Sequence, residues 1–292
     1  MGKRIFLFLA TNLAIIVTLS IVLNLLGFTG YITPGGIDFK ALAVFCLVWG
    51  MGGSFLSLQM SRFIAKRAMG VHLIDGRSGD PTLDGLHNTI ENLTRQANLP
   101  MPEVGVYDSP EVNAFATGPS KKRSLVAVST GLLRRMERRE VEGVLGHEIA
   151  HIANGDMVTM TLLQGIINAF VMFFARVIAY VVRQNVDRRM ADMVSFAVMI
   201  VLEIVLGILG SMITAWFSRQ REFRADLGGA QLAGRDSMLS ALRRLKQTHD
   251  LVDTSNAALA SFKIAGGGKG WLALFATHPP LDQRIAALEG RI

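Results

Sequence analysis

The chain has 292 residues, half of them hydrophobic, and a formal net charge of +7 at pH 7. Apolar residues concentrate in four blocks of about 20 residues each, which favours a membrane protein over a large soluble core. The single cysteine, Cys46, excludes an intrachain disulfide. Basic residues cluster beside the apolar blocks and in the run 121–139. Anionic lipid headgroups are therefore the more natural partner, and we predict no binding of nucleic acid.

The first two apolar blocks form a predicted transmembrane hairpin over residues 1–60. The block 5–27 follows Lys3 and Arg4 and lacks the small-residue cleavage site of a signal peptide, so it is interpreted as a retained anchor. The second block, 39–60, is followed by three basic residues: Arg62, Lys66 and Arg67. Because basic residues gather on the cytoplasmic side of membrane segments, both ends of this hairpin are predicted to lie inside.

Residues 61–156 have an ordinary soluble composition and are predicted to begin a catalytic domain. The periodicity predicts a helix over 83–97, short strands over 104–107 and 125–129, and a second helix over 136–154. Asn154 and Gly155 are typical of a helix end.

Residues 157–218 contain the other two apolar blocks, 157–182 and 192–217, and form a second predicted hairpin. The loop between them carries three arginines, against the usual bias of basic residues toward the cytoplasm. Each block also contains a charge within it, Arg176 or Glu203, and the two depths differ by roughly 7 to 8 Å, so we predict a structural ion pair rather than a substrate-related role.

Residues 219–292 are predicted to be the second part of the catalytic domain. A helix over 237–248 and a last helix from Leu281 are expected, with a glycine-rich flexible loop over 266–270 between them. That loop lacks the spacing of a phosphate-binding loop.

The chemistry is predicted from His147-Glu148-Ile149-Ala150-His151. Two imidazoles four residues apart lie on one face of a helix and can bind a single zinc ion. Glu148 follows the first ligand by one residue and can take a proton from the attacking water. The alternative, surface residues of an ordinary amphipathic helix, does not suit the apolar pattern that flanks the motif.

Catalytic zinc usually takes three protein ligands, so a third must come from elsewhere in the chain. Glu222 is the best candidate, with Asp226 one turn later as a partner of a ligand histidine; a solvated charged turn is the alternative. His151 and Glu222 flank the second predicted hairpin. The chain between them must therefore cross the membrane an even number of times, and one zinc ion per chain is expected close to the membrane surface.

The residues together resemble the membrane zinc proteases of the HtpX and CAAX prenyl endopeptidase type, the HtpX type most closely, over nearly the whole chain. The resemblance rests on the motif with its preceding Gly146, on Glu222 with Asp226, on the segment 113–118, and on His278-Pro279 followed by Arg284. It implies an α-helical membrane protein with an α+β zincin-like (gluzincin) metalloprotease domain and four hydrophobic membrane segments.

The resemblance also implies roles for residues that the pattern alone leaves open. A strand-like edge would bind the substrate backbone, His278 would polarise the scissile carbonyl, and Arg284 would support that arrangement. From the sequence pattern alone, the segment 113–118 is only an extended loop. The pattern supports equally well that His278 is a turn residue before two prolines. The residues implied at the edge are Asn113, Ala114, Phe115 and Ala116.

The implied biology is quality control in a bacterial inner membrane. A multi-pass enzyme with a cytoplasmic catalytic domain would cleave misfolded or damaged membrane proteins under stress, alongside a membrane-bound ATP-dependent protease. The chain departs from the prenyl endopeptidases because it has four candidate spans rather than a seven-helix chamber, and it carries no ATPase motif. Two alternatives stay open: a non-enzymatic zinc-stabilised membrane adaptor, and a protease that matures one dedicated peptide.

Overall fold

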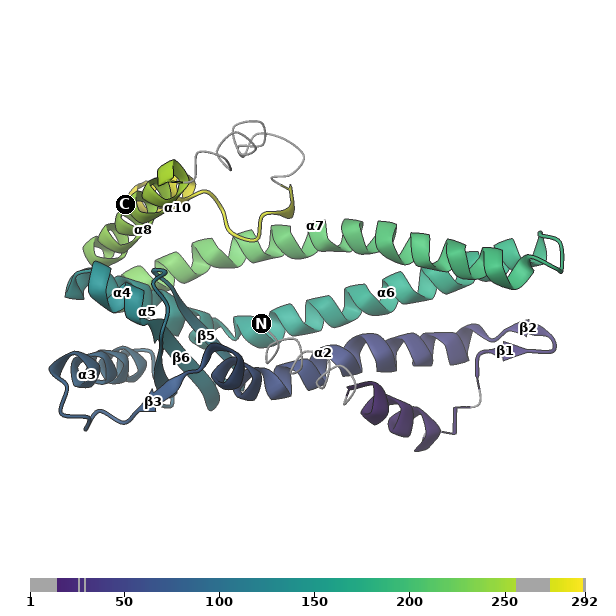
Figure 1. Ribbon diagram of the computed structural model, residues 1–292, viewed down its shortest axis with the longest axis horizontal. Helices are drawn as coiled ribbons and strands as arrows, with labels where there is room; N and C mark the ends of the chain where they lie inside the picture. Colours follow the sequence, from purple (N-terminus) through teal and green to yellow (C-terminus); the bar gives the residue numbers. More distant parts are fainter. Residues whose placement is uncertain (1–14, 26, 29, 256–273, 291–292) are drawn as a thin grey trace. The chain divides into compact units, whose positions relative to one another are not determined.

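The computed structural model describes residues 15–25, 27–28, 30–255 and 274–290 (Figure 1). The chain divides into two compact units. The first, here called the hairpin unit, comprises Met1–Gln59 and Thr159–Thr214. The second, here called the sheet unit, comprises Met60–Val158 and Ala215–Ile292. The predicted glycine-rich loop over 266–270 lies outside the described residues.

Three helices in the described part of the chain are long and apolar enough to cross a membrane. They are α2 (Phe39–Met69), α6 (Asp156–Gln184) and α7 (Ala191–Ala233). They account for three of the four predicted segments. The first predicted segment is described only in part, as a short apolar helix over Ile15–Leu25. Two very short antiparallel strands, β1 (Ile32–Thr33) and β2 (Gly36–Ile37), precede α2.

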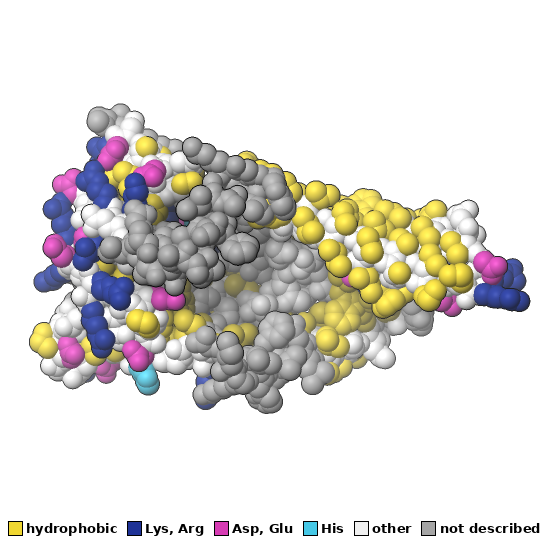
Figure 2. Space-filling view, turned by 45° about the horizontal axis from the view of Figure 1, so that its top comes forward, with side chains coloured by type: hydrophobic (Ala, Val, Ile, Leu, Met, Phe, Trp, Pro, Cys, Tyr) yellow, Lys and Arg dark blue, Asp and Glu magenta, His cyan; other side chains and the backbone are white. Residues whose placement is uncertain are grey.

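The hairpin unit carries its apolar side chains on the outside. Large hydrophobic residues on α6 and α7, such as Phe170, Met193 and Phe196, are about 60% exposed, and Figure 2 shows hydrophobic side chains covering much of one face. An exterior of this kind is unfavourable in water and suits the hydrocarbon core of a bilayer. The predicted ion pair is confirmed, because Arg176 Nη1 lies 2.8 Å from Glu203 Oε1.

The sheet unit contains a four-stranded sheet in the order β3-β4-β6-β5. The strands are β3 (His72–Ile74), β4 (Glu103–Tyr107), β5 (Ala114–Ser120) and β6 (Arg123–Ser129). β4 and β6 run parallel, whereas β3 with β4 and β5 with β6 pair antiparallel. The two predicted strands are confirmed as β4 and β6, and the predicted extended segment becomes the edge strand β5.

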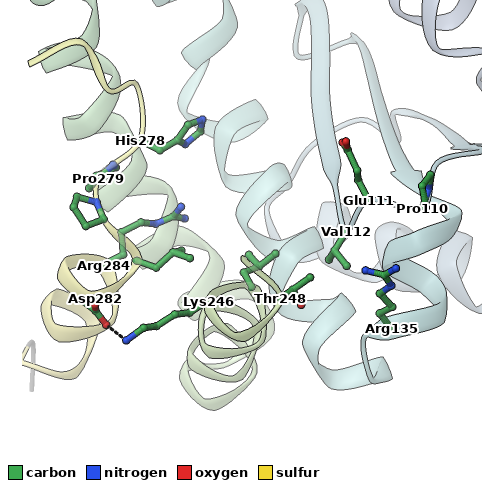
Figure 3. Close-up of a pocket in the computed structure, with 13 residues that line it drawn as sticks. Pro110, Glu111, Val112, Arg135, Lys246, Thr248, His278, Pro279, Asp282 and Arg284 are labelled. Atoms are coloured by element: carbon green, nitrogen blue, oxygen red, sulfur yellow. Dashed lines mark hydrogen bonds and ion pairs between the residues drawn. The ribbon is translucent and has the colours of Figure 1, made fainter. Parts of the chain in front are cut away.

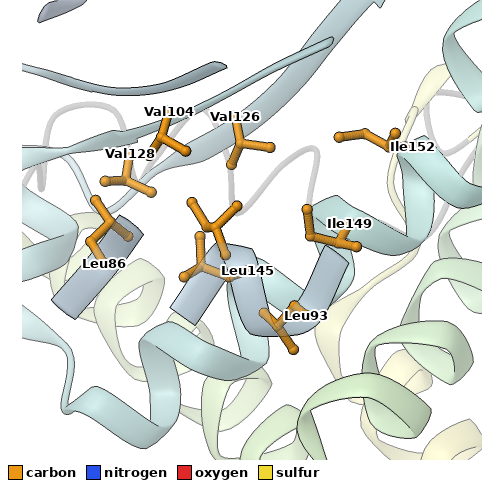
Figure 4. Packing of buried hydrophobic residues seen from close by; sticks show 9 residues of the cluster. Leu86, Leu93, Val104, Val126, Val128, Leu145, Ile149 and Ile152 are labelled. Carbon is orange, nitrogen blue, oxygen red and sulfur yellow. The ribbon is translucent and has the colours of Figure 1, made fainter. Parts of the chain in front are cut away.

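The core of the sheet unit lies between this sheet and the helices α3 (Pro81–Gln96) and α5 (Arg138–Asn154), which are the two helices predicted for this region. Side chains from β4 and β6 meet those of both helices in one cluster (Figure 4). The buried residues of this cluster are Leu86, Ile90, Leu93, Val104, Val126, Val128, Leu145, Ile149 and Ile152. Because each is less than a tenth exposed, this cluster fixes the orientation of α5.

Three further helices complete the sheet unit: α4 (Thr130–Arg135), α8 (Arg235–Ser255) and α10 (Leu281–Glu289). The helices predicted over 237–248 and from Leu281 correspond to α8 and α10. α7 differs from the sequence expectation because it continues without a break past the apolar block, to Ala233. The same helix therefore contains an apolar segment and the residues 219–233 of the sheet unit.

Candidate metal centre and active site

α5 places the two motif histidines side by side. Its apolar residues Leu145, Ile149 and Ile152 are buried in the core cluster, so its other face presents His147 and His151. Both histidines are buried, and their Nε2 atoms lie 3.0 Å apart. Four-residue helical spacing produces this arrangement, because residues i and i+4 share a face.

α7 brings Glu222 to the same place through a close approach of two helices. A Cβ at Gly229 would lie 2.9 Å from the backbone nitrogen of His147, so only glycine permits this packing distance. Glu222 is 1% exposed. Its Oε2 lies 3.5 Å from His147 Nε2, and its Oε1 lies 3.3 Å from His151 Nε2.

A carboxylate stands behind each histidine. His147 Nδ1 is 3.0 Å from Asp226 Oδ1, and His151 Nδ1 is 2.6 Å from Asp156 Oδ2. Ionised carboxylates only accept hydrogen bonds, so each Nδ1 carries a proton, and the Nε2 of each ring is the atom left to bind a metal. The sequence reasoning found Asp226 and missed Asp156. The signal for Asp156 was its position directly after the helix-ending Gly155, whose φ of 70° turns the chain back toward His151.

These donors fit a zinc ion. Ligand atoms of His147, His151 and Glu222 lie within 4.8 Å of one another, and the separations of 3.0, 3.3 and 3.5 Å given above are close to the roughly 3.3 Å between ligand atoms on tetrahedral zinc. Both Glu222 carboxylate oxygens are buried and accept no hydrogen bond of good geometry from the described residues. Such a carboxylate still has lone pairs available to bind a metal ion.

The acidic neighbours also change the protonation of the histidines in the metal-free protein. Burial lowers the pKa of His151, but the neighbouring carboxylates of Asp156 and Glu222 outweigh burial and raise the pKa to about 9. The pKa of His147 is likewise raised, since the neighbouring carboxylates of Asp226 and Glu222 outweigh the effect of burial. A zinc ion must therefore displace protons from this pair at neutral pH.

Two residues near the C-terminus approach the same carboxylates. His278 Nδ1 lies 3.0 Å from Glu222 Oε2 while its side chain stays 63% exposed. Arg284 is buried and donates two hydrogen bonds to Asp226, at 2.6 and 2.8 Å, with Glu222 Oε2 a further 3.3 Å contact. Arg284 thus compensates the charge of Asp226 and Glu222 directly.

Arg219, which the sequence reasoning did not single out, connects α7 to the segment before His278. It donates hydrogen bonds to the backbone carbonyls of Leu274, at 3.1 Å, and Ala276, at 2.7 Å. Because Arg219 lies three residues before Glu222 on α7, one helical turn carries the candidate metal ligand and also binds the segment before His278. Backbone carbonyls give no sequence signal, so this link could not be inferred from the pattern.

Glu148 is half-buried and lines a cavity of about 160 Å³ together with His147, Glu222, His278 and Arg284. Asn113 and Ala114, at the start of β5, line the same cavity. The other two residues of the predicted substrate edge lie elsewhere. Phe115 contacts the ring of Tyr107, and Ala116 packs against the core cluster.

Three membrane-length apolar helices, together with a His-Glu-x-x-His helix and a glutamate from a second helix, define a membrane metalloprotease. Residues 83–292 match the model of Peptidase family M48, and the chain belongs to this family. It is a metalloendopeptidase.

Curated relatives cover the whole chain. The protease HtpX homologue of Bacillus licheniformis is 54% identical over all of both chains. The protease HtpX of Thioalkalivibrio sulfidiphilus is 52% identical over 98% of each. Among solved structures, Ste24p of S. mikatae matches with a TM-score of 0.65 at 18% identity, over 99% of this chain and 64% of the other. That likeness concerns the fold alone.

Proposed function

We propose that this enzyme is a zinc endopeptidase that cleaves misfolded or damaged membrane proteins at the cytoplasmic face of a bacterial inner membrane. The convergence of His147, His151 and Glu222 carries the zinc assignment, because both oxygens of Glu222 are buried and accept no hydrogen bond from the residues that the structure describes. The uninterrupted helix α7, which joins an apolar segment to Glu222, supports a site close to the bilayer.

The orientation is inferred from charge. Arg62, Lys66 and Arg67 follow the apolar part of α2 and belong with the sheet unit in sequence, as expected for the cytoplasmic side. The arginines of the α6–α7 loop oppose this bias. Arg183, in the last turn of α6, is paired with Asp192 at 2.8 Å, so its charge contributes less to this bias.

The proposed mechanism assigns one task to each side chain. Zinc bound by His147, His151 and Glu222 would supply Lewis-acid activation of water and carbonyl. Glu148 takes the proton of the attacking water and passes it to the leaving amine. His278 donates to the carbonyl oxygen as negative charge develops there. Asp226 and Asp156 hold the two histidine rings, and Arg284 fixes Asp226.

The substrate backbone is proposed to add to the free edge of β5. In the sheet order β5 pairs only with β6, so its other edge has no strand partner in the described part of the chain. An added strand is bound through main-chain hydrogen bonds, which hardly depend on sequence. This suits an enzyme that acts on many unfolded segments. Because the chain carries no ATPase motif, an ATP-dependent protease of the same membrane is the proposed partner for extracting substrates.

The test is cleavage of an unfolded membrane protein by the full-length enzyme in lipid nanodiscs. We expect wild type to cleave, a zinc chelator to stop cleavage, and added zinc to restore it. Glu148→Gln should keep its zinc and lose about 10² to 10⁴-fold in kcat. Wild-type rates in Glu148→Gln, or in chelated enzyme, would contradict the mechanism. Cleavage of one peptide alone, across a proteome-wide comparison of active and Glu148→Gln cells, would favour a dedicated maturation protease.

A further inference from the structure

The cavity beside Glu148 has two kinds of lining. One group is polar and belongs to the catalytic constellation described above. The other is apolar and comes from α4, α5 and α8, with Leu132, Val144, Met238, Ala241, Leu242 and Leu245 as its members. Except for the half-buried Leu245, these apolar residues belong to the buried core of the sheet unit. The cavity therefore has firm hydrophobic walls within reach of the catalytic side chains.

A second, larger cavity of about 840 Å³ adjoins the first, because both are lined by Val112, Leu245, His278 and Arg284. Figure 3 shows the segment with Pro110, Glu111 and Val112 on one side of it, and His278 with Arg284 on the other. This open groove leads past the catalytic residues. It is suited to an extended peptide, one side chain of which would reach the smaller cavity.

We propose that the smaller cavity is a specificity pocket that binds an apolar side chain from a residue directly flanking the scissile bond. The inference rests on the proposed protease function and adds a substrate preference to it. An apolar cavity of about 150 Å³ accepts a benzene ring, so the pocket has room for a leucine, methionine or phenylalanine side chain. A charged side chain would lose its hydration against the apolar walls.

This preference gives the enzyme a way to recognise membrane proteins. The β5 edge binds any extended backbone, whereas the pocket selects segments rich in apolar residues, which folded soluble proteins bury. Among the apolar residues from α4, α5 and α8, Leu245 also lines the groove, and it is half-buried rather than part of the tightly packed core. Substitutions there should change the pocket without unfolding the unit.

The experiment digests a short synthetic peptide library with full-length enzyme in nanodiscs and maps the cleaved bonds by mass spectrometry. Wild type should prefer leucine, methionine or phenylalanine over glycine or aspartate at one flanking position by at least about 10-fold. Leu245→Ala should shift that preference toward phenylalanine and tryptophan by about 10-fold, and Leu245→Phe should shift it toward alanine and valine. Leu133→Ala is the matched control, because Leu133, like Leu245, packs against Leu132, Val144 and Ala241 but lines neither cavity.

Efficient cleavage with no preference at either flanking position, or a preference that both Leu245 variants leave unchanged, would overturn the pocket and leave the protease function standing. A shift of equal size in Leu133→Ala would also overturn it. If zinc-loaded wild type cleaves no peptide and no unfolded protein, the proposed protease function fails and the pocket with it.

Discussion

Each of the two units holds charged side chains away from water, but they are arranged differently. In the hairpin unit, Arg176 contacts Glu203, the carbonyl of Met172 and the ring of Phe45, so its charge is paired with that of Glu203. In the sheet unit, two histidines and Glu222 converge on one point, and the remaining carboxylates and Arg284 face them from outside.

The difference separates a structural ion pair from a binding site. In an ion pair the two charges neutralise each other, and replacing both partners by apolar residues often costs little stability. A convergent cluster keeps donor atoms directed at a common point, and the carboxylate oxygens of Glu222 have no hydrogen bond there among the described residues. Removing a member of the cluster should therefore change metal binding and catalysis, whereas changes to the pair should change only stability.

The largest effect is expected for Glu222→Gln, which keeps the volume of the side chain but removes its charge. Zinc affinity should fall by more than about 100-fold, because loss of a direct ligand exceeds the effect of losing a supporting carboxylate. Competition with a fluorescent zinc chelator measures it. Glu91→Gln, at an exposed position on α3, is the control. Unchanged affinity in Glu222→Gln would remove this residue from the metal site.

Zinc affinity should also rise with pH. The pKa of His151 in the folded metal-free protein is raised from 6.5 to about 9, so its protonation stabilises that form fully below pH 6.5 and the contribution is lost as pH rises through 9. Zinc needs the neutral ring. Affinity should therefore increase about tenfold per pH unit for each displaced proton between pH 7 and 9. Calorimetry in buffers of different ionisation enthalpy counts the released protons, and a pH-independent affinity would contradict the expectation.

Asp156→Asn should weaken zinc binding by about 10 to 100-fold, because the amide no longer holds the proton of His151 Nδ1 as firmly as the carboxylate does. The same chelator competition applies. Asp236→Asn serves as the control, since its side chain is exposed and pairs with Arg139 on the surface. If both variants bind zinc equally well, Asp156 does not support the site.

Arg219→Gln should lower kcat/KM by about 10-fold without loss of zinc, because the segment before His278 loses two hydrogen bonds. A double-mutant cycle with His278→Phe is the decisive readout. If Arg219 acts by positioning His278, the double variant should be no slower than His278→Phe alone. Additive losses would assign Arg219 a separate role.

The smallest effect on activity is expected in the hairpin unit. Arg176→Met combined with Glu203→Met should retain most of the cleavage rate and most of the stability in nanodiscs, whereas either single change should lower the melting temperature because it leaves one charge without its partner. A double variant that is inactive but folded would show that the pair takes part in function.

The sequence predicted the parts of the site that depend on local spacing. His147 and His151 follow from helical periodicity, and Glu222 with Asp226 from the same four-residue separation. For the histidines and Glu222 to meet, the two apolar segments between them must form a hairpin. The pattern of apolar blocks in the sequence also indicated this hairpin. The ion pair between Arg176 and Glu203 was predicted because the two residues lie at similar depths in that hairpin.

What the sequence could not give were contacts set by the backbone in three dimensions. Asp156 reaches His151 only because Gly155 adopts a left-handed conformation after the helix. The strand β5 was expected from the residues only as an extended loop. It pairs with β6 through an irregularity at Gly118, where a Cβ would lie 2.2 Å from the carbonyl oxygen of Arg123. The apolar pocket is assembled from α4, α5 and α8, so no single stretch of sequence contains it.

Zinc-edge X-ray absorption spectroscopy of the full-length enzyme in nanodiscs tests the central claim most directly. One zinc per chain should be present, bound by two imidazole nitrogens and by oxygen, with no sulfur. The imidazole signal should change in His151→Ala, and the oxygen shell should change in Glu222→Gln. Full proteolytic activity without stoichiometric zinc, or a spectrum that neither substitution alters, would contradict the assignment of His147, His151 and Glu222 as the metal centre.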